Sequence, residues 1–297
     1  MSNISVSDDF SMFCSNLLIS KPTNNTILKR LQTVTKRINN DFWHIDSENE
    51  HSLFVGSYGR GTAIYTSDVD VVIELPWNEY SRFNDYTHNG QSAFLQSVKH
   101  SILKTYPTSN VQGDGQVVKI DFSDGIKFEI VPAFKFNDGT FYYADSNDGG
   151  KWKSMNPSIE LLMFNYYDGQ FNGNLKRLGK MLRAWKTKMT VLMPGILIDT
   201  ISYHFLSQYQ YAASSFVYYD WISRDFFKYL MDNKDKHSWS KFGSGELVDV
   251  KYSDSIFSDS KKAYDISLEA IAANNNKLYY TWHNKWRDIY GTKFPNA

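Results

Sequence analysis

Hydrophobic positions recur at helical spacing early in the chain and then alternate as in strands. Apolar residues three or four positions apart predict an amphipathic helix after Asn24 and Asn25, with its stripe at Ile27, Leu31, Val34 and Ile38. Strand-like runs follow at 52–56 and 69–75, and a second helical pattern carries Phe94, Val98 and Ile102. This order predicts a mixed α/β unit.

Two alternating runs on either side of a turn then predict a β-hairpin. Polar and apolar residues alternate over 118–122, and Ser123-Asp124-Gly125 suits a tight turn. The return strand is expected to run from Ile126 to Val131 and to stop at Pro132, because proline donates no hydrogen bond to a sheet. The hairpin completes the first half of the chain.

After Gly149-Gly150 the periodicity becomes helical. The predicted helices cover 158–167, 174–188, 195–210, 215–231, 259–273 and 275–290. We therefore expect a catalytic lobe over residues 1–150, with an N-terminal helix able to span both lobes, and an all-helical lobe over 151–297. In the last helix one face carries Tyr279, Trp282, Trp286 and Ile289, and Gly291 is placed to end it.

Composition excludes few functions but indicates the compartment. The 297 residues contain 32 Lys plus Arg and 32 Asp plus Glu, so no global field points to nucleic acid or a membrane surface. Cys14 is the single cysteine, which fits a reducing compartment. The most apolar windows are short and interrupted by polar residues, which argues against a membrane span. We expect a cytoplasmic protein.

The most informative motif is a small-residue turn followed by two carboxylates. Gly56-Ser57 leaves backbone N–H groups open for a phosphate, and Asp68 and Asp70 project to one face of the strand that they begin. Carboxylates in this arrangement suit two Mg²⁺ ions, with Mn²⁺ as an alternative. Either fragment alone is more often a plain turn or a solvated strand end. Together, beside the apolar residues 71–73, they indicate a cation site.

A third carboxylate would complete a two-metal site, and the hairpin offers Asp121 and Glu129. If Phe122 pairs with Ile126, Lys127 faces Asp121 and Lys119 faces Glu129, so both acids could also be ordinary cross-strand ion-pair partners. Spacing leaves the choice between them open.

The predicted helix at 174–188 carries a basic stripe. Lys176, Lys180 and Arg183 lie on the face opposite Leu178 and its apolar neighbours. A solvated surface is the common explanation of such a stripe. Like charges in register also suit a bound anion such as a triphosphate.

Segments along most of the chain resemble one family, the nucleotidyltransferases related to cyclic GMP-AMP synthase and oligoadenylate synthetase. Within this polymerase-β-like superfamily the resemblance is to the bacterial CD-NTases, which make cyclic oligonucleotide signals. The segments are Gly56-Ser57 with Asp68-Val69-Asp70, Phe128 to Phe134, Leu175 to Lys180, Ser202-Tyr203-His204 and Trp286 to Pro295. The resemblance implies an α+β fold, with a mixed-sheet catalytic lobe, a helical lobe and the active site in the cleft between them.

The resemblance also assigns roles to single residues. The third metal ligand precedes an apolar-apolar-Pro ending, which maps to Glu129, where the family usually has Asp. Gly56 and Ser57 would touch the terminal phosphates, Lys180 and Ser202 would hold the triphosphate, and Tyr203 would stack on a base.

The implied enzyme is template-independent and joins nucleoside triphosphates, ATP and GTP among them, into a cyclic di- or trinucleotide with release of pyrophosphate. Its implied setting is antiphage signalling, with an effector that binds the product and a regulatory partner protein. A nucleotidyltransferase acting on a protein, an RNA 3′ end or a small molecule is the alternative.

Overall fold

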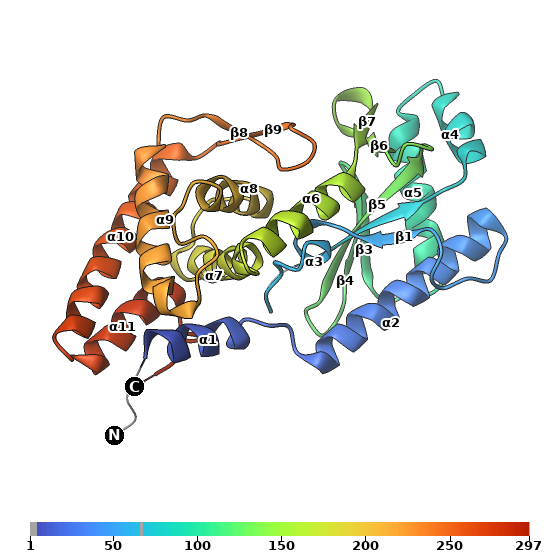
Figure 1. The fold of residues 1–297 in the computed structure, drawn as a ribbon. Coiled ribbons are helices and arrows are strands. Elements are labelled where there is room, and N and C mark those ends of the chain that lie inside the picture. Colours follow the sequence, from blue (N-terminus) through green and yellow to red (C-terminus); the bar gives the residue numbers. More distant parts are fainter. Residues whose placement is uncertain (1–4, 66–67, 297) are drawn as a thin grey trace. The chain divides into compact units, whose positions relative to one another are not determined.

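The computed structural model describes residues 5–65 and 68–296, which divide into two compact units (Figure 1). The sheet unit contains residues 19–60 and 68–161. The helical unit contains residues 5–18, Gly61–Tyr65 and residues 162–296. The chain thus leaves the sheet unit for a short segment, Gly61–Tyr65, before it returns to the strand that carries Asp70.

The sheet unit is built on a mixed seven-stranded sheet. Its main path follows the order β1-β2-β5-β4-β3, and β6 joins the end of β5 and pairs with β7. Of these pairs only β2 with β5 is parallel. The strands are β1 (Ser52–Phe54), β2 (Val69–Glu74), β3 (Asn110–Asp114), β4 (Val117–Asp121), β5 (Lys127–Lys135), β6 (Phe141–Asp145) and β7 (Lys151–Met155).

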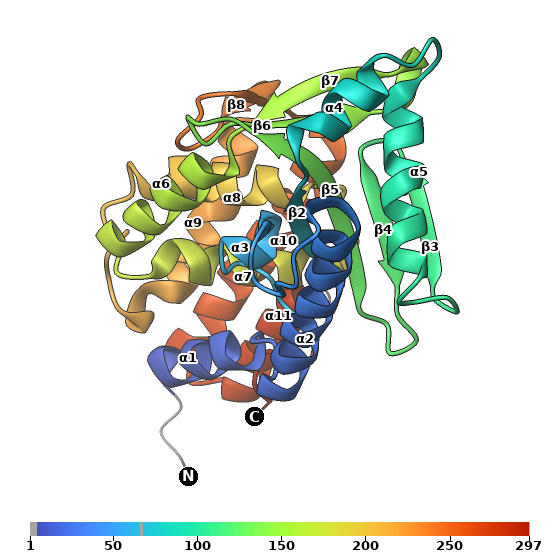
Figure 2. The same cartoon turned by 90° about the vertical axis from the view of Figure 1, so that its right-hand side faces the viewer.

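One face of this sheet is covered by α2 (Lys21–Ile38) and α5 (Gly90–Leu103), as Figure 2 shows. The apolar stripe predicted from Ile27 to Ile38 is buried there, against alternate residues of β2, β4 and β5. α2 begins before Asn24, because Ser20 caps it by accepting the backbone N–H of Thr23. Smaller elements of this unit are η1 (Asn39–Trp43, a π-helical turn), α3 (Gly56–Gly59), α4 (Trp77–Asn84) and η2 (Asn147–Gly149).

β5 corrects the prediction that its strand stops at Pro132. The strand continues to Lys135, and Pro132 is paired in register with Ile73 of β2. Proline lacks one backbone donor but keeps its carbonyl and suits extended backbone, so a strand can pass through it where that donor is not needed.

The helical unit is an all-α core with one small hairpin. Its elements are α1 (Val6–Asn16), the end of α6 (Pro157–Gln170), α7 (Asn174–Met189), α8 (Gly195–Leu206), η3 (Phe216–Tyr218), α9 (Tyr219–Asp232), β8 (Ser238–Ser240), β9 (Leu247–Asp249), α10 (Ser253–Asn275) and α11 (Tyr279–Tyr290). Gly291 has a φ of 81° at the end of α11, as its predicted place after the helix requires.

The first helix packs against the last one. Phe10 of α1 is fully buried, and its ring lies 5.2 Å from those of Trp286 and Phe294. The side-chain amide of Asn16 donates to the carbonyl of Lys293, 277 positions later. α1 therefore belongs to the helical core.

The two units differ from the simple split expected at residue 150. β7 and the start of α6 lie in the sheet unit, and α1 lies in the helical unit. The second half is also not all-helical, because β7 and the β8–β9 hairpin occur in it. β7 has five residues and β8 and β9 have three each, and such short runs give too little alternation to distinguish a strand from a loop.

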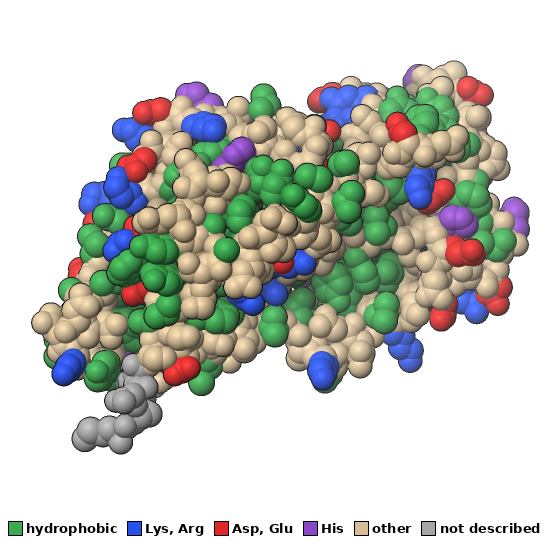
Figure 3. Space-filling model, viewed as in Figure 1, with side chains coloured by type: hydrophobic (Ala, Val, Ile, Leu, Met, Phe, Trp, Pro, Cys, Tyr) green, Lys and Arg blue, Asp and Glu red, His purple; other side chains and the backbone are tan. Residues whose placement is uncertain are grey.

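The surface agrees with the balanced composition. On the face drawn in Figure 3, Lys and Arg side chains are interspersed with Asp and Glu. Among the described residues no helix is both long and apolar enough to cross a membrane.

Candidate active site

Asp70 and Glu129 lie side by side on the parallel strands β2 and β5. On the other side of β5, β4 places Lys119 opposite Glu129, with Lys119 Nζ 2.8 Å from Glu129 Oε1. Side chains alternate between the faces of a strand, and Val69 and Val71 point into the core under α2 and α5. The polar row of Asp70, Glu129 and Lys119 therefore projects from the opposite face of the sheet.

The turn at Gly56-Ser57 is folded onto Asp70. The backbone N–H of Ser57 donates to the Asp70 carboxylate, and the N–H of Val55 donates to the Asp70 carbonyl over 2.9 Å. Gly56 has a φ of +57°, and a Cβ there would lie 1.8 Å from Asp70 Oδ2. Only glycine leaves room for the carboxylate at this position. In this state the Ser57 N–H serves the carboxylate.

The surroundings of Asp70 disfavour the ionised form of its carboxylate. Burial raises the pKa of Asp70 to about 6, and the negative charges of Glu129 and Asp68 add to this, while Arg60 and the Ser57 N–H lower it. Asp68 is exposed at the start of β2, yet partial loss of hydration and the charge of Glu129 also raise its pKa. A bound cation would offset both effects.

The hairpin pairing is as predicted. The N–H of Phe122 donates to the carbonyl of Ile126 over 3.0 Å, and Lys119 and Asp121 face Glu129 and Lys127 respectively. Lys119 and Glu129 form the expected cross-strand ion pair.

Asp121 lies one strand further from β2 than Glu129. Its Oδ2 accepts a hydrogen bond of 2.9 Å from the side-chain amide of Asn110. Glu129 is the charge that most raises the pKa of both Asp68 and Asp70, whereas Asp121 raises that of Asp68 to a smaller extent. The geometry favours Glu129 as the partner of the two aspartates.

The donor set fits a hard divalent cation. Carboxylates held close together with raised pKa values are relieved by a positive charge, and oxygen ligands suit Mg²⁺. In the described part of the chain no three acidic, imidazole or thiol groups converge closely enough to hold an ion as they stand. Glu129 is instead held by Lys119, so it would have to exchange this partner for the cation.

On α7 of the helical unit, Lys180 is half-buried. Burial lowers the pKa of Lys180, the Cys14 thiol opposes this, and Lys176 adds to the lowering. No hydrogen bond or ion pair from the Lys180 ammonium group to another described residue is found. Such a desolvated amine suits an anionic ligand.

The predicted basic stripe needs a correction at Arg183. This residue is only 6% exposed, and its guanidinium forms a two-pronged ion pair with the fully buried Asp199 over 2.6 and 2.9 Å. Lys176 Nζ lies 3.6 Å from Asp168. The three cations therefore do not form one open surface, because the Arg183 guanidinium is bound by Asp199 and the Gly195 carbonyl of α8.

Ser202 and Tyr203 occupy different environments on α8. Ser202 is fully buried, and its hydroxyl donates to the carbonyl of Ile198 over 2.7 Å. Tyr203 is partly exposed, and its ring lies 4.5 Å from that of Tyr167 and 6.3 Å from that of Phe242. The nucleotide-binding roles of Ser202 and Tyr203 remain predictions.

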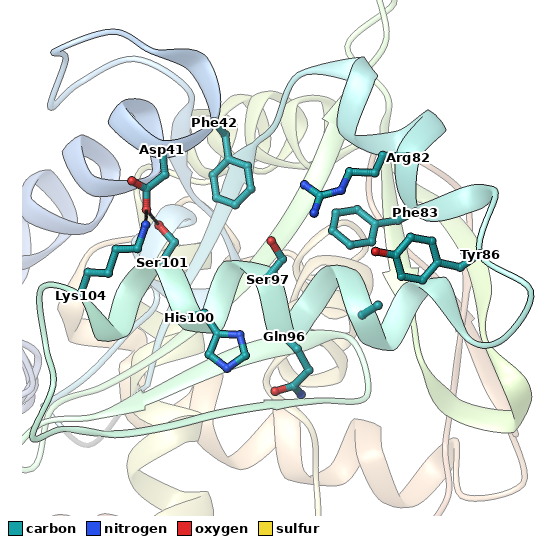
Figure 4. A pocket seen from close by; sticks show the side chains of 11 residues that line it. Asp41, Phe42, Arg82, Phe83, Tyr86, Gln96, Ser97, His100, Ser101 and Lys104 are labelled. Carbon is teal, nitrogen blue, oxygen red and sulfur yellow. Dashed lines mark hydrogen bonds and ion pairs between the residues drawn. The ribbon is translucent and has the colours of Figure 1, made fainter.

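A cavity of about 510 Å³ lies elsewhere in the sheet unit, along α5 (Figure 4). Its cations already have partners, since Arg82 contacts Glu79 and Lys104 contacts Asp41. None of the predicted site residues lines it.

Sequence reasoning did not single out Arg60. It is only 5% exposed, and its charge lowers the pKa of Asp70. The sequence shows an arginine between two glycines soon after Gly56-Ser57. Its effect on Asp70 could not be inferred, because Asp70 lies on the following strand.

Comparisons with known proteins identify the family of the chain. A family model described as Second Messenger Oligonucleotide or Dinucleotide Synthetase domain matches residues 4–165. A probable cyclic nucleotide synthase of Bacillus cereus (strain VD146) is 23% identical over 255 residues, which are 80% of this chain and 74% of that protein.

Solved structures share the fold. CdnC of E. coli MS115-1, in a complex with HORMA-deltaN, matches with a TM-score of 0.73 and 13% identity over 98% of both chains. The cyclic AMP-GMP synthase DncV of Vibrio cholerae, in complex with the linear intermediate 5′ pppA(3′,5′)pG, matches with a TM-score of 0.67 and 12% identity over 98% of this chain and 87% of that one.

The fold and these likenesses define a nucleotidyltransferase. The chain belongs to the Second Messenger Oligonucleotide or Dinucleotide Synthetase family, whose model matches more than half of its length.

The raised pKa of Asp70 predicts that Asp70→Asn increases the stability of the fold, and that the increase depends on pH. Since the pKa is 3.8 ordinarily and about 6 in the fold, the free energy of unfolding falls as the pH rises through this window. At pH 8 the substitution should remove a penalty of about 1 kcal/mol, allowing for solvent screening, and raise Tm by roughly 2–4 °C. At pH 4 it should change Tm little.

Thermal unfolding at both pH values, with and without Mg²⁺, measures this. Mg²⁺ should raise the Tm of the wild type at pH 8 but not that of Asp70→Asn. The exposed Asp85→Asn is the control and should show neither effect. Equal Tm values of the wild type and Asp70→Asn at pH 8 would contradict the electrostatic assignment.

Proposed function

We propose that this enzyme joins ribonucleoside triphosphates into a cyclic di- or trinucleotide second messenger and releases pyrophosphate at each step. The observation that carries the proposal is the pairing of Asp70 with Glu129, beside Gly56-Ser57, in a chain of the second-messenger synthetase family. ATP and GTP are the proposed substrates.

In each step a ribose hydroxyl attacks the α-phosphate of a triphosphate in line with the leaving pyrophosphate. A new P–O bond forms, the bond to the β-phosphate oxygen breaks, and the hydroxyl proton passes to solvent. Asp68, Asp70 and Glu129 would hold divalent cations, Mg²⁺ or Mn²⁺. When bound, such cations lower the pKa of the attacking hydroxyl and offset charge on the leaving group. Ser57 and Gly56 contact the terminal phosphates.

A second transfer on the linear product closes the ring. The DncV structure with a linear intermediate supports this order of events by analogy. The same row of carboxylates serves both steps, because each is an attack of a ribose hydroxyl on an α-phosphate with pyrophosphate leaving.

The helical unit contributes Lys180 to the triphosphate and Tyr203 to a base. Lys180 has a desolvated ammonium group, and Tyr203 presents a partly exposed ring. Ser202 is proposed to support the phosphate contacts from α8, although its hydroxyl is engaged within that helix in this state.

The proposed setting is antiphage signalling in the cytoplasm, with an effector that binds the product. A regulatory partner is also proposed, since CdnC forms a complex with a HORMA protein. Transfer to a protein, RNA 3′ end or small-molecule acceptor is the alternative, and the following assay distinguishes it.

Incubation with the four ribonucleoside triphosphates and Mg²⁺, without any acceptor, should yield pyrophosphate and a cyclic product identified by mass spectrometry. The double variant Asp68→Asn with Asp70→Asn should remain folded and form no product, because these side chains serve cations and not the core. Turnover by the folded double variant would refute the metal assignment. A wild type that needs an added acceptor would favour the alternative.

Glu129→Gln should lower kcat by at least about a hundredfold with saturating Mg²⁺, since losing one ligand removes transition-state stabilisation worth several kcal/mol. Asp121→Asn is the matched change one strand away and should keep kcat within about threefold. The reverse pattern, an inactive Asp121→Asn with an active Glu129→Gln, would show that Asp121 is the third ligand.

Lys180→Ala should lower kcat/KM for the triphosphate by roughly ten- to hundredfold, because a charged hydrogen bond is worth about 1.5–3 kcal/mol. Its Tm should change little. Lys188→Ala, at the exposed end of the same helix, should change neither quantity. Equal activity of both variants and wild type would show that Lys180 takes no part in binding the triphosphate.

A further inference from the structure

A buried polar cluster in the helical unit joins Arg183 of α7, Asp199 of α8 and Thr62 of the segment Gly61–Tyr65. Asp199 and Thr62 are fully buried, and Arg183 is 6% exposed. The two terminal nitrogens of Arg183, Nη1 and Nη2, donate to the Asp199 carboxylate, and the Thr62 hydroxyl donates to Asp199 Oδ2 over 3.0 Å. The same guanidinium donates to the carbonyls of Gly179 and Gly195.

Two glycines give the cluster its room. A Cβ at Gly179 would lie 3.0 Å from Asp199 Oδ1 and 3.1 Å from the Thr62 methyl carbon. A Cβ at Gly195 would lie 3.1 Å from the Arg183 guanidinium. Side chains at these positions would force α7, α8 and the segment apart, so the close approach is built into the sequence.

The segment that Thr62 anchors connects two parts of the catalytic motif. It directly follows Arg60, whose charge lowers the pKa of Asp70, and it leads into the strand that begins after Asp68. Ala63 and Ile64 are buried beside Thr62 within the helical unit. The segment is thus fixed in one unit while the residues on either side of it belong to the other.

We propose that the Arg183–Asp199–Thr62 cluster positions the carboxylates for catalysis by holding this segment on α7 and α8. Lys180 directly follows Gly179, and Tyr203 is one turn after Asp199. Within the helical unit the cluster therefore fixes Gly61–Tyr65, which precedes Asp68 in the sequence, on the two helices that carry the proposed nucleotide contacts. Thr62 is a positioning residue, and the inference rests on the proposed function.

The Thr62 hydroxyl can be tested apart from its bulk. Valine has nearly the same shape but no donor, and Asp199 would keep its ion pair with Arg183, so Thr62→Val should fold. Thr62→Ser keeps the donor. Thr200 of α8 is the matched control, because it is a fully buried threonine like Thr62. Unlike that of Thr62, its hydroxyl has no hydrogen-bond partner among the described residues.

Pyrophosphate release with saturating Mg²⁺ should show kcat of Thr62→Val lowered roughly ten- to hundredfold, with KM for the triphosphate changed less than about threefold, because small misplacements of reacting groups are costly. Thr62→Ser and Thr200→Val should keep kcat within about threefold. Ile64→Val shortens a buried side chain of the same segment and should lower Tm while keeping kcat. A purely structural role would instead make kcat follow Tm across all four variants.

Amide hydrogen exchange of peptides covering 68–74 provides a readout that needs no turnover. Thr62→Val should exchange faster there than wild type and Thr200→Val. A folded Thr62→Val with wild-type kcat, or with unchanged exchange, would overturn the proposal. If Thr62→Val does not fold, Thr62→Ala removes the hydroxyl without added bulk and carries the same two measurements. A wild type without pyrophosphate release would count against the proposed function alone, and the exchange result would still decide the role of Thr62.

Discussion

The repulsion between Asp70 and Glu129 is the constraint around which the sheet unit is arranged. Parallel pairing of β2 with β5 places these carboxylates opposite each other. Burial raises the pKa of Asp70, and the charge of Glu129 raises it further. A fold selected only for stability would not keep two like charges at this place. Their persistence is understandable if a cation bound during the reaction offsets them.

The surroundings of the row reduce this repulsion without removing it. Lys119 neutralises Glu129 from the neighbouring strand, and the Ser57 N–H and Arg60 stabilise ionised Asp70. The Lys119 side chain is half-exposed, so water can solvate its ammonium group when Glu129 binds another partner. The chain thus holds its acids charged and close together while leaving them available.

Contacts between residues close in sequence could be predicted from the sequence, whereas contacts between distant segments could not. The hairpin register followed from local alternation and one turn, and it was confirmed by the pairing of Lys119 with Glu129. The parallel contact between β2 and β5 joins distant segments, which periodicity does not reveal, so the choice of Glu129 needed the family resemblance. Arg183 was misplaced for the same reason, because its partner Asp199 lies on another helix. α1 was not predicted, because its apolar residues are buried by contacts with α11, which is distant in sequence.

The packing of α1 on the last helix also affects how the protein is made. Phe10 packs against Trp286 and Phe13 against Phe294, so both early residues leave the ribosome long before their partners are synthesised. The contact from Asn16 to Lys293 spans 277 positions, which takes roughly 15–55 s to translate at about 5–20 residues per second. All strands of the sheet unit, which end at Met155, are translated within that time, while the apolar face of α1 still lacks its partners from α11. The nascent chain therefore cannot complete the helical core around Lys180 and Tyr203 until α11 and Phe294 have been translated.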